Sequence, residues 1–391
     1  MQAHMYYFDH NATTPIASPV LTVLTEALES VYGNASSIHR TGQEARGRLE
    51  AARKQVADLL GVSVKEIIFT SGGTEADNQA IFGVVRGAAG AARRHVVTTT
   101  IEHSAVLNCC GKLQREGVEV TYVPVGASGV VDPDDVRRAM RPETVLVSVM
   151  LANNELGTIQ PVREIARMAR EAGVPVHCDG VQATGKIPVS VRELGVDFFA
   201  LSAHKLYGPK GAGALYVRQG VEFEPVLYGG RHEGGRRPGT ENVPGGIGLG
   251  AAAAHAGSHL DVEQERLAKL RDRLEAGVLA SVPDAHVNGA GSPRVPNTTN
   301  IRFDGIEGEA MVIALDLRGF CVSSGAACSS GAVEPSHVLT AIGLSKQDAR
   351  SAVRFSLGQS NDERQVDELI GAVAECASHL RRLSPVYAGA R

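Results

Sequence analysis

The stretch VDFFALSAHKLYGPKGAGALYV, residues 196–217, decides the fold. Two apolar runs of strand length flank a turn that carries Ser202, His204 and Lys205 and is rich in glycine. In α/β proteins, ligands bind beyond the carboxyl ends of the strands, which is where this lysine would stand. A surface lysine at a strand exit is the ordinary alternative. Here, however, Ser202 and His204 offer hydrogen-bonding groups suited to a phosphate, and the glycines let the backbone approach closely.

On both sides of this stretch, short apolar strands alternate with helical patterns, as in βαβ units that build a parallel sheet. Residues 41–60 have apolar positions at helical spacing and stop before Gly61, a suitable helix end. The segment 161–173 begins at Pro161 and ends at Gly173, which also suits a helix. Strands are expected at 66–70, 95–100, 144–150, 174–179, 196–202 and 213–218.

The sequence pattern changes near residue 260. A charged helical pattern covers 259–279, and a second one covers 361–383. We therefore predict an α/β protein with a large domain over residues 15–258, in which a mostly parallel sheet lies between helices. Residues 1–14 together with 259–391 would form a smaller α+β domain. Between the two, residues 229–246 are rich in Gly and Arg, which is typical of a flexible linker.

Composition and charge point to a small, soluble substrate. The chain has 391 residues and a formal net charge of -4, and it contains no strongly basic or acidic block. We therefore predict neither a nucleic-acid nor a membrane partner. The amino terminus lacks a basic stretch followed by an apolar one, so we predict a cytoplasmic protein. The six cysteines lack the paired spacings of a zinc site or a disulfide framework, and no metal site is expected.

A second candidate for phosphate binding is EIIFTSGGTEADNQAIFG, residues 66–83. It reads as a strand, a tight turn and a helix that opens near Gly73 and Thr74. The free N–H groups and the positive dipole end of such a helix attract an anion, and the Thr74 hydroxyl adds a donor. Ordinary helix capping by Thr74 explains the pattern equally well.

Three further strands also end in polar residues. Asp179 ends a buried-type strand and Gln182 follows three residues later, while His103 and Asn154 follow two other strands. A buried carboxylate is costly unless it has a positive partner, such as a protonated pyridine nitrogen. An aspartate that caps a helix explains Asp179 equally well. A structural histidine and an Asn-Asn turn are the alternatives for the other two. What favours function is that five successive βα units each offer such a group at the same edge of the sheet.

The whole set of motifs resembles the cysteine desulfurases of the NifS and IscS type, within the class-V aminotransferase-like enzymes of fold type I. The resemblance covers nearly the whole chain and follows the family's order. Ala203 stands where the family commonly has Gly, and Ala326 and Ser329 stand where Ser and Thr are frequent. The motifs that carry the resemblance are FDHNATTP, FTSGGTEADN, IEHSAVL, ANNELGTIQPV, CDGVQATGK, SAHKLYGPKG, RRPGTEN, SSGAACSSGAVEPSHVL and VRFSLG.

The resemblance implies a pyridoxal 5'-phosphate enzyme, and it assigns a role to each motif. Lys205 would form the Schiff base with the cofactor, and Asp179 would pair with its pyridine nitrogen. The ring would be stacked by His103, and its phenolic oxygen side would face Gln182 and Asn154. A second subunit of a homodimer would contribute Thr240, which replaces the linker interpretation of residues 229–246. The phosphate would be held by Gly73, Thr74, Ser202 and His204, and the substrate carboxylate by Asn11 and Arg354.

The segment with Cys328 distinguishes a desulfurase from its aminotransferase relatives. It stands in a run of Ser, Gly and Ala that is typical of a loop, whereas Cys321 and the other four cysteines stand in patterns typical of buried positions. Cys328 would accept sulfur from L-cysteine as a persulfide and release L-alanine. The sulfur would pass to an acceptor protein, for iron–sulfur cluster assembly or another thiolation pathway.

Three other functions compete with this one. A selenocysteine lyase or a class-V aminotransferase would use the same fold, with less need for Cys328. A sulfur-delivery scaffold, without catalysis of its own, comes from a different class, and the complete set of cofactor residues argues against it. As a further alternative at one position, Arg354 could be part of a buried structural ion pair.

Overall fold

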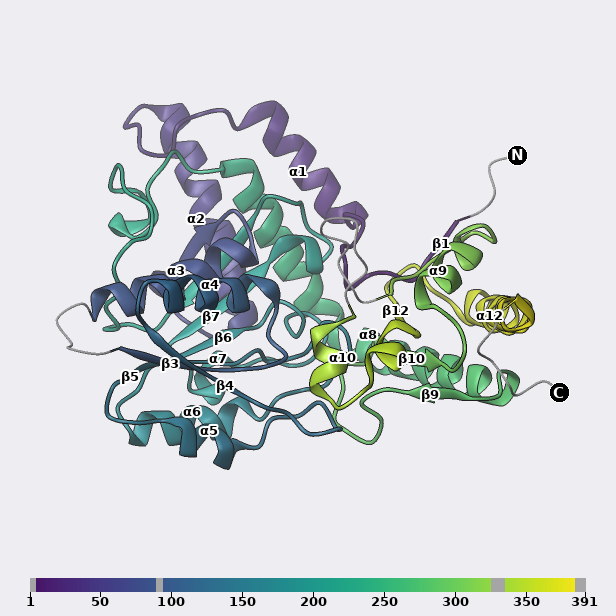
Figure 1. The fold of residues 1–391 in the computed structure, drawn as a ribbon. Helices are drawn as coiled ribbons and strands as arrows, with labels where there is room; N and C mark the ends of the chain where they lie inside the picture. Colours follow the sequence, from purple (N-terminus) through teal and green to yellow (C-terminus); the bar gives the residue numbers. More distant parts are fainter. Residues whose placement is uncertain (1–4, 89–93, 325–334, 384–391) are drawn as a thin grey trace.

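The computed structural model describes residues 5–88, 94–324 and 335–383 (Figure 1). Cys328 and its neighbours Ala326 and Ser329 therefore lie outside the described residues. Within the described ranges, no helix is both long enough and apolar enough to cross a membrane.

A seven-stranded sheet forms the centre of the larger part of the molecule. Its strands are β2 (Ile67–Thr70), β3 (His95–Thr99), β4 (Glu119–Val123), β5 (Thr144–Ser148), β6 (Val176–Asp179), β7 (Phe198–Ser202) and β8 (Gly213–Val217). They lie in the order β2-β8-β7-β6-β5-β3-β4. Only β8 runs antiparallel to its neighbours, β2 and β7, and all other neighbouring pairs are parallel. The predicted mostly parallel sheet is confirmed.

Helices cover both faces of this sheet, and Figure 1 shows α3 and α4 on the opposite side of the strands from α5 and α6. Short helical turns η1 (Val64–Glu66), η2 (Ala203–Lys205) and η3 (His232–Gly235) lie in the connections. The helices of this part are α1 (Ser18–Ser30), α2 (Arg40–Leu60), α3 (Gly73–Gly87), α4 (Ser104–Arg115), α5 (Pro133–Ala139), α6 (Val162–Glu171), α7 (Val191–Leu194) and α8 (Val243–Ser281).

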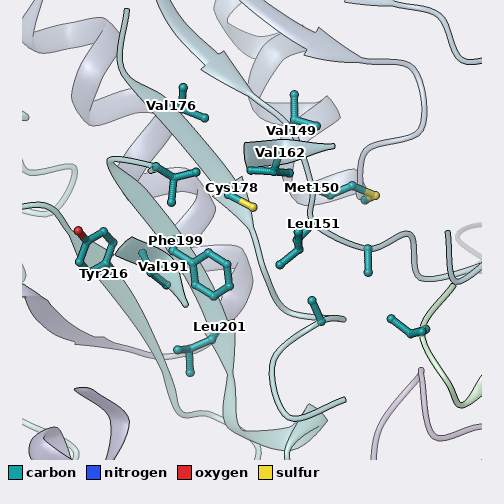
Figure 2. Packing of buried hydrophobic residues seen from close by; sticks show 14 of the residues in the cluster. Val149, Met150, Leu151, Val162, Val176, Cys178, Val191, Phe199, Leu201 and Tyr216 are labelled. Carbon is teal, nitrogen blue, oxygen red and sulfur yellow. The ribbon is translucent and has the colours of Figure 1, made fainter. Parts of the chain in front are cut away.

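The side chains of β7 show why the sheet is buried on both faces. Phe199 and Leu201 pack with one hydrophobic cluster, whose members around Cys178 appear in Figure 2, while Phe198 and Ala200 pack with another cluster beneath α3 and α4. Successive residues of a strand point to opposite faces, so a strand that is covered twice must be apolar throughout. The continuous apolar run in the sequence therefore reflects a central strand.

A smaller lobe follows α8 (Figure 1). Its three-stranded antiparallel sheet has the order β12-β10-β9, and a separate parallel pair joins β1 to β11. Phe8, near the amino terminus, packs with Phe303 and Phe355 of this lobe. Its elements are β1 (Tyr6–Tyr7), β9 (Ala285–Val287), β10 (Thr298–Phe303), α9 (Gly308–Asp316), β11 (Phe320–Cys321), α10 (His337–Ala341), α11 (Lys346–Arg350), β12 (Ala352–Ser356) and α12 (Glu363–Leu383).

Helix α8 is the main difference from the sequence-based expectation. A charged helix was expected from residue 259, but α8 already begins at Val243 and runs unbroken to Ser281. Its first half is rich in glycine, which disfavours an isolated helix. A Cβ atom at Gly250 would come within 2.5 Å of Ala52 Cα, so the glycine is what allows α8 to pack closely on α2. The division of the chain at 258/259 remains a proposal, because α8 crosses that point without a break.

Most of the other predicted elements are present. The helix predicted at 41–60 is α2, and it ends at Gly61 in the left-handed conformation. The helix predicted within 161–173 is α6, with Gly173 just beyond it at a positive φ. The edge strand β4 was missed, although Val120, Tyr122 and Val123 give it strand-forming residues.

Candidate active site

A cavity of about 410 Å³ lies at the carboxyl ends of the parallel strands. The loops that follow β2, β3, β5, β6 and β7 all contribute to its lining, as the parallel arrangement requires. The predicted site residues that line it are Asn11, Gly73, Thr74, His103, Asn154, Asp179, Gln182, Ser202, His204, Lys205 and Arg354. The structure thus brings together residues that are far apart in the sequence.

Of the predicted residues that the structure describes, Thr240 is not part of this lining. Thr240 is exposed and borders a different pocket, together with Thr70 and Arg237 of the same chain. Cys328 lies outside the described residues, but Ser323, five positions before it, lines the cavity.

Part of the cavity lining supplies hydrogen-bond donors for an anion. Gly73 and Thr74 form the amino terminus of α3, where no side chain caps the helix. Ser202 and His204 line the same cavity. Burial, followed by Lys205 and Lys210, lowers the pKa of His204 to about 4, so its ring is neutral at physiological pH. The helix terminus and these two side chains together suit a phosphate group.

A negative charge next to this helix terminus is neutralised by an arginine. Glu75 is in the first turn of α3, where it would repel an anion. Arg237 Nε lies 2.7 Å from Glu75 Oε1, and Arg237 Nη2 lies 3.2 Å from Glu75 Oε2. Although burial opposes it, this pairing lowers the pKa of Glu75. The paired arginine belongs to the RRPGTEN segment, so this segment contacts the first turn of α3 at the cavity.

The cavity lining also carries a buried carboxylate. Asp179 is 7% exposed, and its Oδ1 accepts a hydrogen bond of 2.9 Å from the N–H of Val181. Burial raises the pKa of Asp179, while His103 and Lys205 oppose that shift. Among the residues that the structure describes, Asp179 forms no ion pair. A buried carboxylate in that position favours a cationic ligand atom in the cavity.

His103 lines the cavity as the N-cap of α4. Its Nδ1 accepts a hydrogen bond of 3.1 Å from the N–H of Ala105, so the proton of the neutral ring is on Nε2. Burial lowers the pKa of His103, and Lys205 and His337 act in the same direction against Asp179. His103 is an exposed residue of the cavity lining, as a stacking surface would be.

Lys205 lines the cavity from η2, just after β7. Its Nζ donates hydrogen bonds to the carbonyl oxygen of Asn11 and, at 2.7 Å, to that of Ala12. Burial and then Arg354 lower the pKa of Lys205 to about 8, although Asp9 and Asp179 act in the opposite direction. An amine with that pKa is a far better nucleophile and base near neutral pH than an ordinary lysine.

This pKa can be tested by competitive labelling of the apoprotein with limiting acetic anhydride over a range of pH. Because only the neutral amine reacts, we expect Lys205 to be labelled with a midpoint near the pKa of about 8. The exposed Lys210 in the same segment serves as the control and is followed in the same samples. Peptide mass spectrometry measures both, and equal midpoints would contradict the assignment of an activated amine.

Arg354 and Asn11 are both engaged within the protein. Arg354 Nη2 pairs with Asp9 Oδ1 at 2.7 Å, so the structural ion pair considered above is present. Arg354 Nη1 also donates to the carbonyl of Asn154, whereas its buried Nε has no partner among the described residues. The two N–H groups of Asn11 donate to Thr298 Oγ1 and to the carbonyl of Asn154. A substrate carboxylate could therefore reach Asn11 Nδ2 only by replacing one of these acceptors.

Sequence reasoning missed a second buried carboxylate in the lining, that of Asp77. It is 1% exposed, and its Oδ1 lies 3.3 Å from His177 Nε2, a fully buried group beneath the cavity. Burial and the nearby Asp179 raise the pKa of Asp77. Its position three residues after Thr74, one helical turn along α3, was the available signal.

The cysteines mostly match the sequence-based expectation. Cys109, Cys110, Cys178 and Cys376 are buried as predicted. Burial raises the pKa of Cys109 and Cys110 to about 12, which makes both thiols inert. Cys321 was expected to be buried and is instead partly exposed in the two-residue strand β11, which pairs with β1. Burial still raises its pKa.

Comparisons with known proteins agree with this geometry. The model of the family "Aminotransferase class-V" matches residues 6–369. "Cysteine desulfurase IscS" of Methanosarcina thermophila is 44% identical over 380 residues, which cover 97% of this chain and 94% of that protein. A solved "NifS-like protein" has a TM-score of 0.90 at 39% identity, covering 96% of this chain and all of the other. The structure "SspA in complex with cysteine" has a TM-score of 0.80 at 36% identity, covering 90% and 98% of the two chains.

The site and the comparisons lead to the same family. An identity of 44% over nearly the full length of both chains, with a family model that covers residues 6–369, leaves no part of the site outside the match. The chain belongs to the class-V aminotransferase family, within the group of the NifS-like and IscS cysteine desulfurases.

Proposed function

We propose that this protein is a pyridoxal-phosphate-dependent cysteine desulfurase, which converts L-cysteine to L-alanine and retains the sulfur as a persulfide on Cys328. The observation that carries the proposal is the cavity of about 410 Å³, whose lining brings together an activated amine, an anion-binding helix terminus and a buried carboxylate. These three groups match the aldehyde, the phosphate and the pyridine nitrogen of one cofactor.

The residues of the cavity fit pyridoxal phosphate. Gly73 and Thr74, with Ser202 and His204, would hold the phosphate. Asp179, which forms no ion pair within the described protein, would hold the protonated pyridine nitrogen. The ring would lie against His103, with Gln182 and Asn154 on its phenolic oxygen side. When bound, the cofactor would link covalently to amino groups and accept electrons from bonds broken at the substrate.

The protein groups would then handle protons and sulfur. Lys205, whose pKa is about 8, would take the Cα proton of L-cysteine as general base. The Cys328 thiolate would attack the substrate Sγ, so that a sulfur–sulfur bond forms and the Cβ–Sγ bond breaks. The electron pair of the broken bond stays with Cβ, and the proton lost by Cys328 balances the one that Cβ gains. L-alanine and the persulfide are the products.

The residues that flank the segment with Cys328 support its access to this cavity. Ser323 lines it, and a chain of five residues spans at most about 18 Å. On the other side of the segment, the ring of His337 bonds to the carbonyl of Glu102 at 2.9 Å, next to His103. Ser336 Oγ donates to the buried Glu155 at 2.6 Å. Both flanks of residues 325–334 are thus anchored at the site.

The test is product analysis with purified holoprotein, L-cysteine and a thiol reductant. We expect one L-alanine and one sulfide for each L-cysteine consumed, with no keto acid required. A requirement for a keto acid would instead identify a class-V aminotransferase, and turnover of selenocysteine without turnover of cysteine would identify a selenocysteine lyase. A protein that turns over none of these substrates would act as a scaffold.

A homodimer is also proposed, because Thr240 does not line the cavity of its own chain. Ala35 and Ser36 border one pocket together with residues of the same segment as Thr240, among them Arg231, Arg236 and Glu241. Next to it stand the exposed apolar side chains of Tyr32 and Ile38, 83% and 94% exposed, which a second copy would cover. The partner's copy of this segment would bring Thr240 to the phosphate.

The dimer predicts a mass in solution of twice 41.1 kDa. Ile38→Asp should shift sedimentation toward the monomer and lower activity in parallel, because it places a charge in the covered face. Leu317→Asp, at an 83% exposed apolar position of the smaller lobe, is the matched control and should leave the dimer intact. A monomeric wild type with full activity would rule out the contribution of Thr240.

The destination of the sulfur and the cytoplasmic location remain predictions. An acceptor protein is proposed for either iron–sulfur cluster assembly or another thiolation pathway, since a persulfide must pass its sulfur on before the next turnover.

A further inference from the structure

Lys186 is a buried amine next to the cavity, and the proposed function assigns it no role. It is 8% exposed and borders a small pocket on the far side of Lys205. No carboxylate of the described residues forms an ion pair with it. Burial, together with Lys205 and Arg354, lowers its pKa. A buried amine without a counterion costs stability, so its hydrogen bonds must offset that cost.

Those hydrogen bonds go to two amide side chains of the site. Lys186 Nζ donates to Asn11 Oδ1 at 2.8 Å and to Gln182 Oε1. The contact with Gln182 follows from the local backbone, in which Lys186 stands four residues after Gln182 and the N–H groups of Thr184 and Lys186 close helical turns. Gly185 has a φ of +74°, and a Cβ there would come within 2.6 Å of Leu206. The glycine therefore allows Lys186 to turn under the cavity.

The amine helps to set how both amides are oriented, and at Asn11 the Nδ2 group of Asn297 donates to the same Oδ1 at 3.1 Å. Both a charged and a neutral lysine amine carry at least two N–H donors, so the two amide oxygens face Lys186 in either state. Gln182 must then direct its N–H groups away from Lys186, and one of them donates to the carbonyl oxygen of Asn11 at 3.0 Å. Asn11 likewise directs its N–H groups to Thr298 Oγ1 and to the carbonyl of Asn154.

The same carbonyl connects this arrangement to Lys205. The main-chain oxygen of Asn11 accepts hydrogen bonds from both Gln182 Nε2 and Lys205 Nζ. An amide that reversed its orientation would present an oxygen to this carbonyl, and the resulting repulsion would move the loop that carries Asn11. The placement of the Lys205 amine therefore depends on groups that Lys186 holds.

We infer that Lys186 is a positioning residue, which fixes the orientations of Gln182 and Asn11 and through them places Lys205 and the donor that faces the cofactor's phenolic oxygen. The inference rests on the proposed function. Lys186 is not among the described residues that line the cavity, so its effect should pass through the two amides.

The first experiment compares Lys186→Met, which keeps the length of the side chain and removes its donors, with Lys269→Met, an exposed lysine of α8. We expect Lys186→Met to weaken pyridoxal phosphate binding to the apoprotein and to lower kcat, each by about tenfold, as the loss of buried hydrogen bonds predicts. Lys269→Met should change neither quantity. The melting temperature of each apoprotein separates a loss of positioning from a loss of folding.

A double-mutant cycle with Gln182→Leu decides the question. If Lys186 acts through the Gln182 amide, Lys186→Met should change the cofactor dissociation constant much less in the Gln182→Leu background than in the wild type. Effects that simply multiply would overturn the inference. Should Lys186→Met fail to fold, the same cycle is run with Lys186→Gln. Because the dissociation constant does not need turnover, a wild type that fails to desulfurate L-cysteine would overturn the proposed function and still leave the cycle to decide on Lys186.

Discussion

Replacing Lys205 by alanine is expected to lower kcat for L-cysteine by roughly 10⁴-fold or more, because the covalent attachment point and the general base are lost together. The phosphate contacts at Gly73, Thr74 and Ser202 remain in the variant. We therefore expect cofactor to be retained noncovalently, with a smaller loss of affinity than of activity. Steady-state alanine production measures the first effect, and equilibrium dialysis of the cofactor measures the second.

The matched control is Lys210→Ala, which removes an exposed lysine five residues further along the same segment. It should retain wild-type activity. The Asn11 carbonyl keeps its hydrogen bond from Gln182 when Lys205 is removed, so the fold of the loop should survive. Activity of Lys205→Ala within tenfold of the wild type would mean that another amine holds the cofactor, and the assignment of this site would be wrong.

Cys328→Ser is expected to abolish alanine production, by roughly 10³-fold or more, while leaving the earlier steps in place. Lys205 and the cofactor suffice for removal of the Cα proton, so adding L-cysteine should still change the visible absorption of the variant. The serine hydroxyl remains protonated at neutral pH and attacks sulfur poorly, whereas a thiolate attacks it well. Absorption spectroscopy and alanine analysis on the same sample separate the two stages.

Cys321→Ser provides the control, since Cys321 is the other thiol of this region and is partly exposed in β11. It should produce alanine at the wild-type rate. Mass spectrometry of the wild type after brief exposure to L-cysteine, without reductant, should place the added sulfur on the peptide with Cys328. Added sulfur on Cys321, or normal alanine production by Cys328→Ser, would overturn the mechanism and leave the cofactor site untouched.

Much of the cavity could be predicted from the sequence because its residues belong to local patterns, each within one strand and the loop after it. An apolar run such as residues 198–202 identifies a strand that is buried on both faces, and a polar residue at its end identifies the edge where ligands bind. Parallel strands expose their carboxyl ends at one edge, so residues after β2, β3, β5, β6 and β7 had to meet. Strand ends and glycine caps are set by neighbours within a few residues, which is why Gly61 ends α2 as predicted.

Other features depend on contacts between distant segments, and only the tertiary structure decided them. The first half of α8 is helical although its glycines oppose it, because close packing of Gly250 on Ala52 of α2 offsets the low propensity. Lys186 meets Asn11 across 175 positions of sequence, so no local pattern could show that it orients the site. The sequence by itself determined the strands that carry the site, the polar residues at their ends and the family. The tertiary structure decided which buried groups face one another, because burial and hydrogen-bond partners are properties of the packed chain and not of any one segment.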